Sequence, residues 1–257
     1  MEFPIFHHSH LEILRYAQND TNMKALILAA GLGNRLGAAM PKALVRVAGQ
    51  ELLGHQLAFL KNPKIEKIGV VTGFQAPKLA DFIQTLDSKI EIFENRRFTE
   101  GNILSLQAAL PFLDDDFLLL NVDHIYPQRL LETVFKQAKG ITACSDFDRE
   151  LVADDMKISV DQKNHLKEID KGLKKYDGGY IGMTFCPKSR LKHYIAGLEK
   201  TLAAFGTKTN VEKILGELAN AGETIHIANT SGIRWLEVDT PEDLKLAEKA
   251  LHEKKGL

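Results

Sequence analysis

A glycine-rich segment, Leu28-Ala-Ala-Gly-Leu-Gly-Asn-Arg-Leu-Gly37, is followed closely by Lys42 in the sequence Pro-Lys-Ala-Leu. Gly31 and Gly33 lack a Cβ atom and permit positive φ, so backbone N–H groups can turn toward an anion. Arg35 and Lys42 add positive charge beside those groups. The segment is therefore predicted to bind a chain of phosphate groups.

Two other glycine-rich phosphate loops fit this segment less well. A dinucleotide-binding fingerprint needs a glycine where Leu36 stands, and an acidic residue at the end of the second strand, which instead reads Val71-Thr72-Gly73. The P-loop needs Gly-Lys-Ser/Thr, which the sequence does not contain. A tight glycine turn with scattered surface bases remains the purely structural alternative.

Two carboxylates occupy positions that suit a metal ion. Asp123 follows the apolar run 117–122, and Asp239 follows the short run 233–238. A carboxylate at the end of a buried strand is costly unless it is paired, solvated or bound to a cation. Mg²⁺ prefers such hard oxygen ligands. Each residue alone can also be explained structurally, as a cap of the segment that follows it.

Three neighbouring features are not predicted to take part. His124 should point away from Asp123 if strand geometry continues through it. Asp114-Asp115-Asp116 precedes a strand, at the end opposite the glycine-rich segment, and is interpreted as a solvated turn. Asp154-Asp155 is interpreted in the same way, although it lies nearer to the expected substrate-binding portion.

Alternating strands and helices must position these residues. A continuous apolar run at 24–29 is typical of a strand buried on both faces. The pattern predicts further strands at 67–72, 90–93, 116–122 and 141–145, with helices over 51–61, 77–86, 102–112 and 128–138. Such alternation indicates βαβ units, and hence a three-layer α/β fold with a mostly parallel central sheet.

The pattern changes after residue 150. A hairpin is predicted over 156–160 and 165–169, followed by a strand at 179–185, helices near 190–204 and 210–220, and strands at 224–228 and 233–238. Thr240, Pro241 and Asp243 have the residue types of a helix start. This part is expected to form a small β-hairpin and helical portion on the substrate side.

Composition narrows the class of protein. The 257 residues are 44% hydrophobic and 26% charged, with 33 Lys+Arg against 34 Asp+Glu, which argues against a nucleic-acid partner. No apolar run reaches the roughly 18 residues of a membrane span, so an integral membrane protein is not expected. Cys144 and Cys186 are too few for a disulfide framework. We expect a soluble, cytoplasmic enzyme or ligand-binding domain.

The first 22 residues differ from the rest of the chain. They lack the features of a secretory signal, and His7, His8 and His10 are interpreted as incidental rather than as metal ligands. We expect residues 1–22 to be a dispensable extension. Residues 23–257 are then expected to form one nucleotide-binding and catalytic domain.

Several segments of the sequence resemble those of a known family. The glycine-rich segment with Pro-Lys-x-Leu, together with Gly101-Asn-x-x-Ser-Leu106, Val122-Asp-His-Ile-Tyr126 and Trp235-x-Glu-Val-Asp-Thr-Pro-Glu-Asp243, is similar to the signature of nucleotidyltransferases that act on sugar phosphates and alcohol phosphates. The resemblance covers about 23–250. It is strongest to CTP:inositol-1-phosphate cytidylyltransferases, with phosphocholine cytidylyltransferases close behind. The implied fold is that of nucleotide-diphospho-sugar transferases.

The resemblance also implies roles for individual residues. Arg35 would grip the triphosphate, Lys42 the α-phosphate and Lys157 the phosphate of the acceptor. Asp123 and Asp239 would hold Mg²⁺. Nucleotide binding is implied for Leu28, Ala29, Ala30, Gly31, Gly33, Thr72, Gly73, Asn102 and Ser105, and acceptor binding for Lys157, Asp177 and Tyr180. Asn102 and Ser105 can alternatively serve as caps of the helix that they begin.

The implied reaction transfers CMP from CTP to a phosphorylated alcohol, with inositol 1-phosphate as the first candidate. The acceptor stays open because Gly179-Tyr-Ile-Gly182 stands where the inositol enzymes carry Asp-Thr-Gly. Aromatic side chains at Tyr126, Tyr176, Tyr180 and Trp235 could cage a quaternary ammonium, or belong to the core. The alternatives are a sugar-1-phosphate or phosphocholine nucleotidyltransferase, a non-catalytic nucleotide sensor and, more remotely, a dinucleotide-dependent oxidoreductase.

Overall fold

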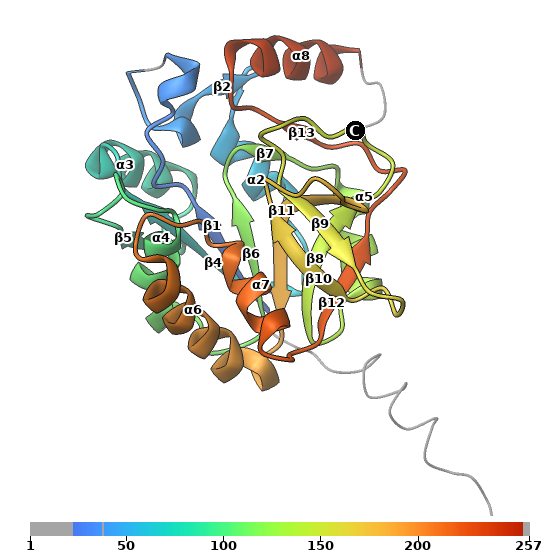
Figure 1. The fold of residues 1–257 in the computed structure, drawn as a ribbon. Coiled ribbons are helices and arrows are strands. Elements are labelled where there is room, and N and C mark those ends of the chain that lie inside the picture. Colours follow the sequence, from blue (N-terminus) through green and yellow to red (C-terminus); the bar gives the residue numbers. More distant parts are fainter. Residues whose placement is uncertain (1–22, 38, 254–257) are drawn as a thin grey trace, which may run out of the picture.

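A nine-stranded mixed sheet runs through the computed structural model, which describes residues 23–37 and 39–253 (Figure 1). Its strands are β1 Met23–Leu28, β4 Ile65–Thr72, β5 Glu91–Glu94, β6 Phe117–Asn121, β8 Ile141–Asp146, β9 Lys157–Val160, β10 Leu166–Asp170, β11 Gly178–Cys186 and β12 Ile225–Asn229. The main order is β10-β9-β11-β6-β1-β4-β5, and β8 joins β11 to β12. The extension 1–22 and its histidines lie outside the described residues.

The strands β1, β4, β5 and β6 form a parallel unit. Leu28 at the end of β1 pairs with Val71 of β4 on one side and with Asn121 of β6 on the other. Because parallel strands end at the same edge, the loops after β1, β4 and β6 leave the sheet together. This edge therefore receives the glycine-rich segment, Gly73 and Asp123.

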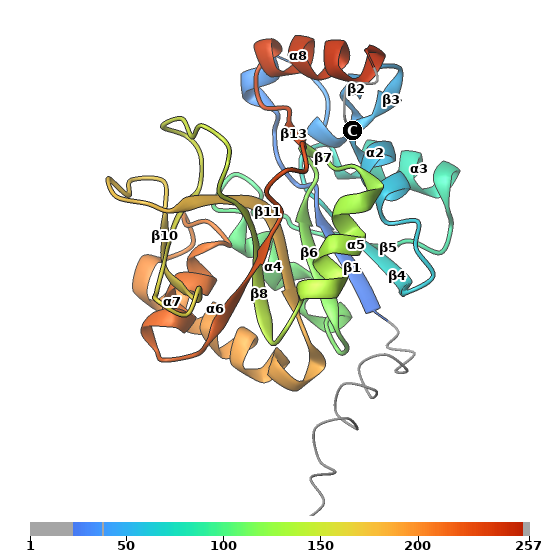
Figure 2. The same ribbon diagram turned by 90° about the vertical axis from the view of Figure 1, so that its right-hand side faces the viewer.

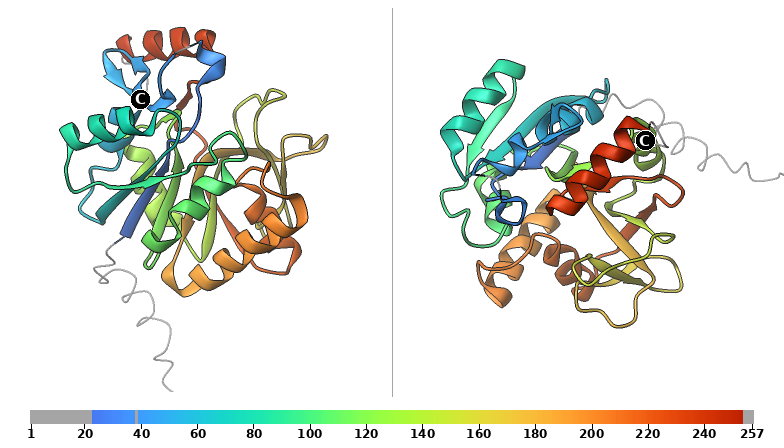
Figure 3. Two further views of the ribbon diagram at one scale, coloured as in Figure 1. Left: turned by 90° about the vertical axis from the view of Figure 1, so that its left-hand side faces the viewer. Right: turned by 90° about the horizontal axis from the view of Figure 1, so that it is seen from above.

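Helices cover both faces of the sheet, as the alternation of side chains along a buried strand requires. Leu26 and Leu28 pack in one core cluster with α4 Ile103–Ala108, α6 Leu191–Phe205 and α7 Lys213–Asn220. Ala25 and Ile27 pack in a second cluster with α2 Leu52–Phe59, α3 Ala76–Leu86 and α5 Gln128–Gln137. Figure 2 shows α5 against β6 and β1, and the left view of Figure 3 shows the opposite face. The predicted three-layer α/β fold is confirmed.

The sheet becomes mixed at β11. This strand runs antiparallel to β6, β8 and β9, while β8 and β12 pair in parallel. Its register shifts between Tyr180 and Thr184, and Gly182 in that interval has φ +72°, which favours glycine. The predicted hairpin is present as β9 and β10, and it extends the sheet beyond β11.

A third, smaller cluster joins segments from both halves of the sequence. It contains Val45, Val47, Ile125, Val238 and Ala247. These residues belong to or adjoin β2 Arg46–Val47, β7 His124–Ile125, β13 Leu236–Glu237 and α8 Pro241–His252, while β3 Gln50–Glu51 pairs with β2. Figure 1 and the right view of Figure 3 show α8 beside the blue amino-terminal segments, above the strand ends.

The start of α8 forms as predicted. Asp243 donates its backbone N–H to Thr240 Oγ1 at 3.2 Å, and the Thr240 N–H donates to Asp243 Oδ2 at 2.9 Å, which completes a capping box. Within 23–37 and 39–253, no helix combines the length and apolar character needed to cross a membrane.

Candidate active site

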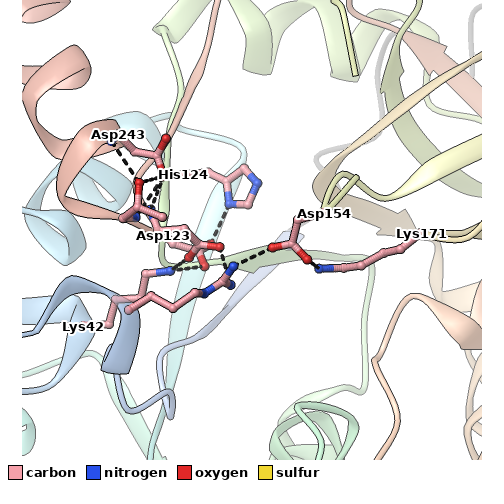
Figure 4. A network of polar contacts seen from close by, with 9 residues as sticks. Lys42, Asp123, His124, Asp154, Lys171 and Asp243 are labelled. Atoms are coloured by element: carbon pink, nitrogen blue, oxygen red, sulfur yellow. Dashed lines mark hydrogen bonds and ion pairs between the residues drawn. The ribbon is translucent and has the colours of Figure 1, made fainter. Parts of the chain in front are cut away.

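Lys42 lies at the centre of a charged cluster at the carboxyl-terminal edge of the sheet (Figure 4). It begins the short 3₁₀ helix Lys42–Leu44 after Pro41, and only 8% of its surface is exposed. Its Nζ donates to Asp123 Oδ2 at 2.7 Å and also contacts Asp239. Burial would lower the pKa of Lys42, but the two carboxylates outweigh burial and raise that pKa. Lys42 is thus held as a cation.

Arg35 extends this cluster toward the β9–β10 hairpin. Its guanidinium donates to Asp239 at 2.6 Å and to Asp154 at 2.5 Å, and Lys171 Nζ donates to the other oxygen of Asp154 at 2.6 Å (Figure 4). The Arg35 and Asp154 side chains are more than half exposed, so this ion pair is weak. A phosphate group can therefore displace it at little cost. Asp154 therefore belongs to the charged cluster, and Asp155 is buried and bound to Arg149, so the interpretation of 154–155 as a solvated turn is wrong.

Asp123 binds His124 as well as Lys42. His124 Nδ1 lies 2.7 Å from Asp123 Oδ1, so the expectation that the two side chains point apart is wrong. The physical reason is that β6 ends at Asn121, and strand alternation does not continue through the following turn. Burial would raise the pKa of Asp123, but Lys42 and His124 hold it well below its usual value.

Glu237 is a third carboxylate of the cluster that the sequence prediction missed. Single oxygen atoms of Asp123, Glu237 and Asp239 all lie within 4.8 Å of one another. Glu237 and Asp239 are two residues apart in an extended segment, a spacing that places side chains on one side and was a usable signal. Three hard oxygen donors around one point are suited to Mg²⁺.

A cavity of about 210 Å³ opens next to these charges. Its lining includes the charged or titratable residues Arg35, Asp123, His124, Asp154, Lys171, Glu212, Glu237 and Asp239, together with Asn102, Asn121, Tyr180 and Asn210. A second cavity of about 350 Å³ shares Arg35, Asp154, Asp155, Glu237 and Asp239. A larger hollow of about 810 Å³ between β4, β5 and α2 contains none of the predicted phosphate or metal ligands, so we assign no chemistry to it.

The glycine-rich segment brings Arg35 toward Lys42. Gly33 has φ +64°, and a Cβ atom on it would lie 3.3 Å from the Lys42 Cβ. Glycine is therefore favoured both by backbone conformation and by close packing against Lys42. Gly31 does not have positive φ and has open space around it. Leu28, Ala29 and Ala30 are buried beneath this turn.

Several predicted nucleotide-binding residues do not line these cavities. Thr72 is buried and donates to the Phe93 carbonyl at 3.3 Å, and buried Ser105 accepts from Asn95 at 3.1 Å. At Gly73, a Cβ atom would lie 2.8 Å from Ala30, which explains the glycine by packing. Their predicted roles in base recognition stay predictions.

Asn102 lines the cavity but does not cap its helix. Its Oδ1 accepts from the Val211 backbone N–H at 2.7 Å, and no side-chain capping bond is formed at the start of α4. The capping alternative is therefore wrong for Asn102. This hydrogen bond joins the start of α4 to the segment before α7, 109 positions away in the sequence.

Lys157 begins β9 on the predicted hairpin, but it does not line either cavity. It is 6% exposed, and its Nζ donates to the backbone carbonyls of Val152, Ala153, Asp155 and Lys171, at 2.8, 3.3, 3.3 and 3.0 Å. Lys157 therefore fixes the loop beside the cavity, because its ammonium donors are all directed at carbonyl groups. Asp177 is exposed and accepts from the Val160 backbone N–H at 2.8 Å, away from the lining residues.

The aromatic residues do not form a cage. Trp235 stacks on His124 with ring centroids 5.1 Å apart, and Arg149 lies 4.7 Å from the same indole. Tyr126 is buried and donates to the Ile181 carbonyl at 2.5 Å, while Tyr176 is exposed. Tyr180 lines the cavity, with its hydroxyl 2.8 Å from Thr184 Oγ1.

The aspartate run before β6 lies at the opposite end of the sheet, as predicted. Asp114 pairs with Lys24 at 2.6 Å, and the Asp116 carboxylate accepts from the Lys188 backbone N–H at 2.8 Å. Both contacts are structural. The run is not part of the charged cluster.

Comparisons with known proteins show what the chain is similar to. A family model described as "MobA-like NTP transferase domain" matches residues 25–154. The chain is 30% identical over 232 residues to a "Bifunctional IPC transferase and DIPP synthase" of Rubrobacter xylanophilus, covering 88% of this chain and 51% of that protein. It is 27% identical over 243 residues to a "CMP-5'-(3-aminopropyl)phosphonate synthase" of Streptomyces rubellomurinus, covering 88% of this chain and 38% of that protein. The chain thus spans about half, or less, of these relatives.

Solved structures share the fold. An inositol-1-phosphate CTP transferase from T. maritima superposes with a TM-score of 0.77 at 21% identity, covering 93% of this chain and 99% of the other. A CTP:phosphocholine cytidylyltransferase from Streptococcus pneumoniae gives a TM-score of 0.73 at 20% identity, covering 90% and 99%. At this identity the likeness concerns the fold alone.

Proposed function

Because the chain belongs to the family of MobA-like NTP transferase domains and is a nucleotidyltransferase, we propose that its pocket transfers CMP from CTP to a phosphorylated alcohol. Inositol 1-phosphate is the first candidate for that alcohol. The observation that supports the proposal best is that four side chains contact one another beside one cavity, namely Lys42, Arg35, Asp123 and Asp239. Two cations that can grip phosphates face carboxylates that can hold a metal.

The reaction requires little acid–base catalysis. A phosphate monoester has a second pKa of about 6, so it is largely dianionic at neutral pH. One of its oxygens attacks the α-phosphorus of CTP, a new P–O bond forms, and the bond to the bridging oxygen breaks as pyrophosphate leaves. Catalysis then depends on alignment and on neutralising charge on the phosphates. Lys42 would hold the α-phosphate and Arg35 the outer phosphates.

The three clustered carboxylates would hold Mg²⁺ in this scheme. Asp123, Glu237 and Asp239 supply oxygen ligands, and the low pKa of Asp123 keeps its carboxylate ionised. When bound, the ion neutralises charge on phosphate oxygens and orients them. Lys42 and Arg35 exchange their carboxylate contacts for phosphate contacts when the nucleotide binds.

Lys171 is the better candidate to hold the acceptor phosphate. It lines the cavity, and its side chain is 41% exposed, whereas Lys157 is surrounded by carbonyl groups. The Lys171 ammonium is bound to Asp154, which also binds Arg35. Lys171 therefore stands next to the cation proposed for the nucleotide phosphates.

Replacing Lys171 with alanine should raise the KM for the acceptor about 10-fold or more, because one charged hydrogen bond to phosphate is lost. The KM for CTP should change little. Steady-state kinetics with each substrate varied in turn measures both values. Lys167→Ala on the exposed side of β10 is the matched control. An acceptor KM raised by Lys157→Met at unchanged thermal stability, and not by Lys171→Ala, would restore the original assignment to Lys157.

The proposed function is tested by measuring pyrophosphate release over a matrix of four NTPs and a panel of phosphorylated alcohols and sugars. The highest rate should occur with CTP and inositol 1-phosphate. A preference for another NTP with a sugar 1-phosphate, or for phosphocholine, would change the substrates assigned to the protein. The assignment of nucleotidyl transfer would stand. Nucleotide binding without pyrophosphate release from any pair would identify a sensor.

A further inference from the structure

Glu212 is a buried carboxylate that lines the cavity. The nucleotide-binding and metal-binding roles proposed above do not use it. It is 7% exposed and lines the same cavity as the charged cluster. Its Oε1 accepts from Asn121 Nδ2 at 3.3 Å, a long contact with a neutral amide. Glu212 is also outside the group of carboxylates that converge on the metal position.

Helix capping does not explain this residue. Glu212 occupies the N-cap position of α7, where Ser, Thr, Asp and Asn are favoured, and its side chain makes no capping bond. Burying a carboxylate without a cationic partner is costly, and burial raises the pKa of Glu212. A buried carboxylate in a cavity lining that neither caps its helix nor forms an ion pair is a candidate ligand-binding group.

The backbone around Glu212 is held in place by the segment just before α4. Gly101 donates its N–H to the Thr207 carbonyl at 2.8 Å, and a Cβ atom at Gly101 would lie 2.0 Å from the Thr209 carbonyl oxygen. Asn102 holds the Val211 N–H. The segment 207–212 is therefore fixed against 101–102, and Glu212 is positioned before any ligand binds.

The neutral polar residues of this lining are suited to hydroxyl groups. Asn102, Asn121 and Asn210 line the same cavity as Glu212 and offer amides, and amides and carboxylates are directional hydrogen-bonding groups. A quaternary ammonium would need exposed aromatic faces. Among the described residues that line this cavity, Tyr180 is the only Phe, Tyr or Trp, and one such ring cannot form a cage.

Building on the proposed function, we propose that Glu212 is a specificity-determining residue that accepts hydrogen bonds from hydroxyl groups of the acceptor. The acceptor class is then a phosphate monoester of a polyhydroxylated alcohol. A site built to bind a hydroxyl disfavours an analogue that lacks it, because its own polar groups are left unpaired.

The test compares inositol 1-phosphate, cyclohexyl phosphate and phosphocholine as acceptors with CTP. Cyclohexyl phosphate has a similar ring without hydroxyl groups. Wild-type protein should favour the polyol by at least about 10-fold in kcat/KM over both other acceptors. Glu212→Gln should reduce this preference about 10-fold through the KM for the polyol, and the KM for CTP should stay constant. Glu217→Gln on α7 is the matched control.

A loss of stability alone would not change the ratio between two acceptors, so the ratio separates recognition from folding. An unchanged ratio in Glu212→Gln, or a wild-type preference for phosphocholine or cyclohexyl phosphate, overturns the role of Glu212 while CMP transfer remains. If Glu212→Gln does not fold, the wild-type ratios decide. No pyrophosphate from any NTP and acceptor overturns the proposed function and this assignment together.

Discussion

Replacing Lys42 with alanine should lower kcat/KM by about 10²- to 10³-fold, the usual cost of removing one preorganised charge from a transition state. Lys42 is nearly buried and is the cation that contacts both Asp123 and Asp239. Water cannot supply the same fixed charge to the α-phosphate. Initial rates of pyrophosphate release with CTP and the preferred acceptor measure the effect.

The matched control is Lys24→Ala. Lys24 is as buried as Lys42, at 8% exposed, and donates to the Phe112 carbonyl at 3.0 Å near Asp114, at the opposite end of the sheet. Its loss should lower the midpoint of thermal unfolding without changing kcat. A Lys42→Ala protein that retains near-normal turnover would refute the mechanism proposed for this site.

Replacing Asp123 with asparagine should raise the Mg²⁺ concentration needed for half-maximal activity by at least about 10-fold. Loss of a residue that only hydrogen-bonds to a metal ligand commonly lowers metal affinity or activity by about 10- to 100-fold. Asp123 is proposed as a direct ligand, so its loss should cost at least as much. The neutral amide also removes the charge that raises the pKa of both Lys42 and His124. Rates measured over a Mg²⁺ titration at saturating CTP give the shift.

Two further variants separate metal binding from general electrostatics. Glu237→Gln should shift the Mg²⁺ requirement in the same direction, because Glu237 lies in the same group of carboxylates. Asp114→Asn, at the far end of the sheet, should not. An Asp123→Asn protein with the wild-type Mg²⁺ requirement would remove Asp123 from the metal site.

Much of the fold was predictable because its signals are local. The apolar run of β1 and the cap at Thr240 determine elements by themselves. Lys42 and Asp123 could be placed together because each adjoins the carboxyl-terminal edge of a parallel sheet. The antiparallel direction of β11 was not predictable, since a buried strand has the same residue pattern in either direction.

Two residues of the charged cluster, in the loops that flank the β9–β10 hairpin, could not be predicted. Asp154 and Lys171 lie in loops, where no period relates side-chain direction to sequence. Lys157 was assigned to the acceptor from a family position, and only tertiary structure shows its ammonium among carbonyl groups. Glu237 was the one omission with a readable signal, its spacing of two from Asp239.

The ion pairs between the glycine-rich segment and the segment before α8 also constrain how the protein folds. Arg35 and Asp239 are 204 positions apart in the sequence, and Lys42 and Asp239 are 197 apart. Such distant pairs form only after a long loop has closed, which is entropically costly and slow. A nascent or partly folded chain without the segment that carries Asp239 can present a glycine turn and one carboxylate, but not the complete set of groups. Catalytic competence therefore cannot precede completion of the tertiary structure.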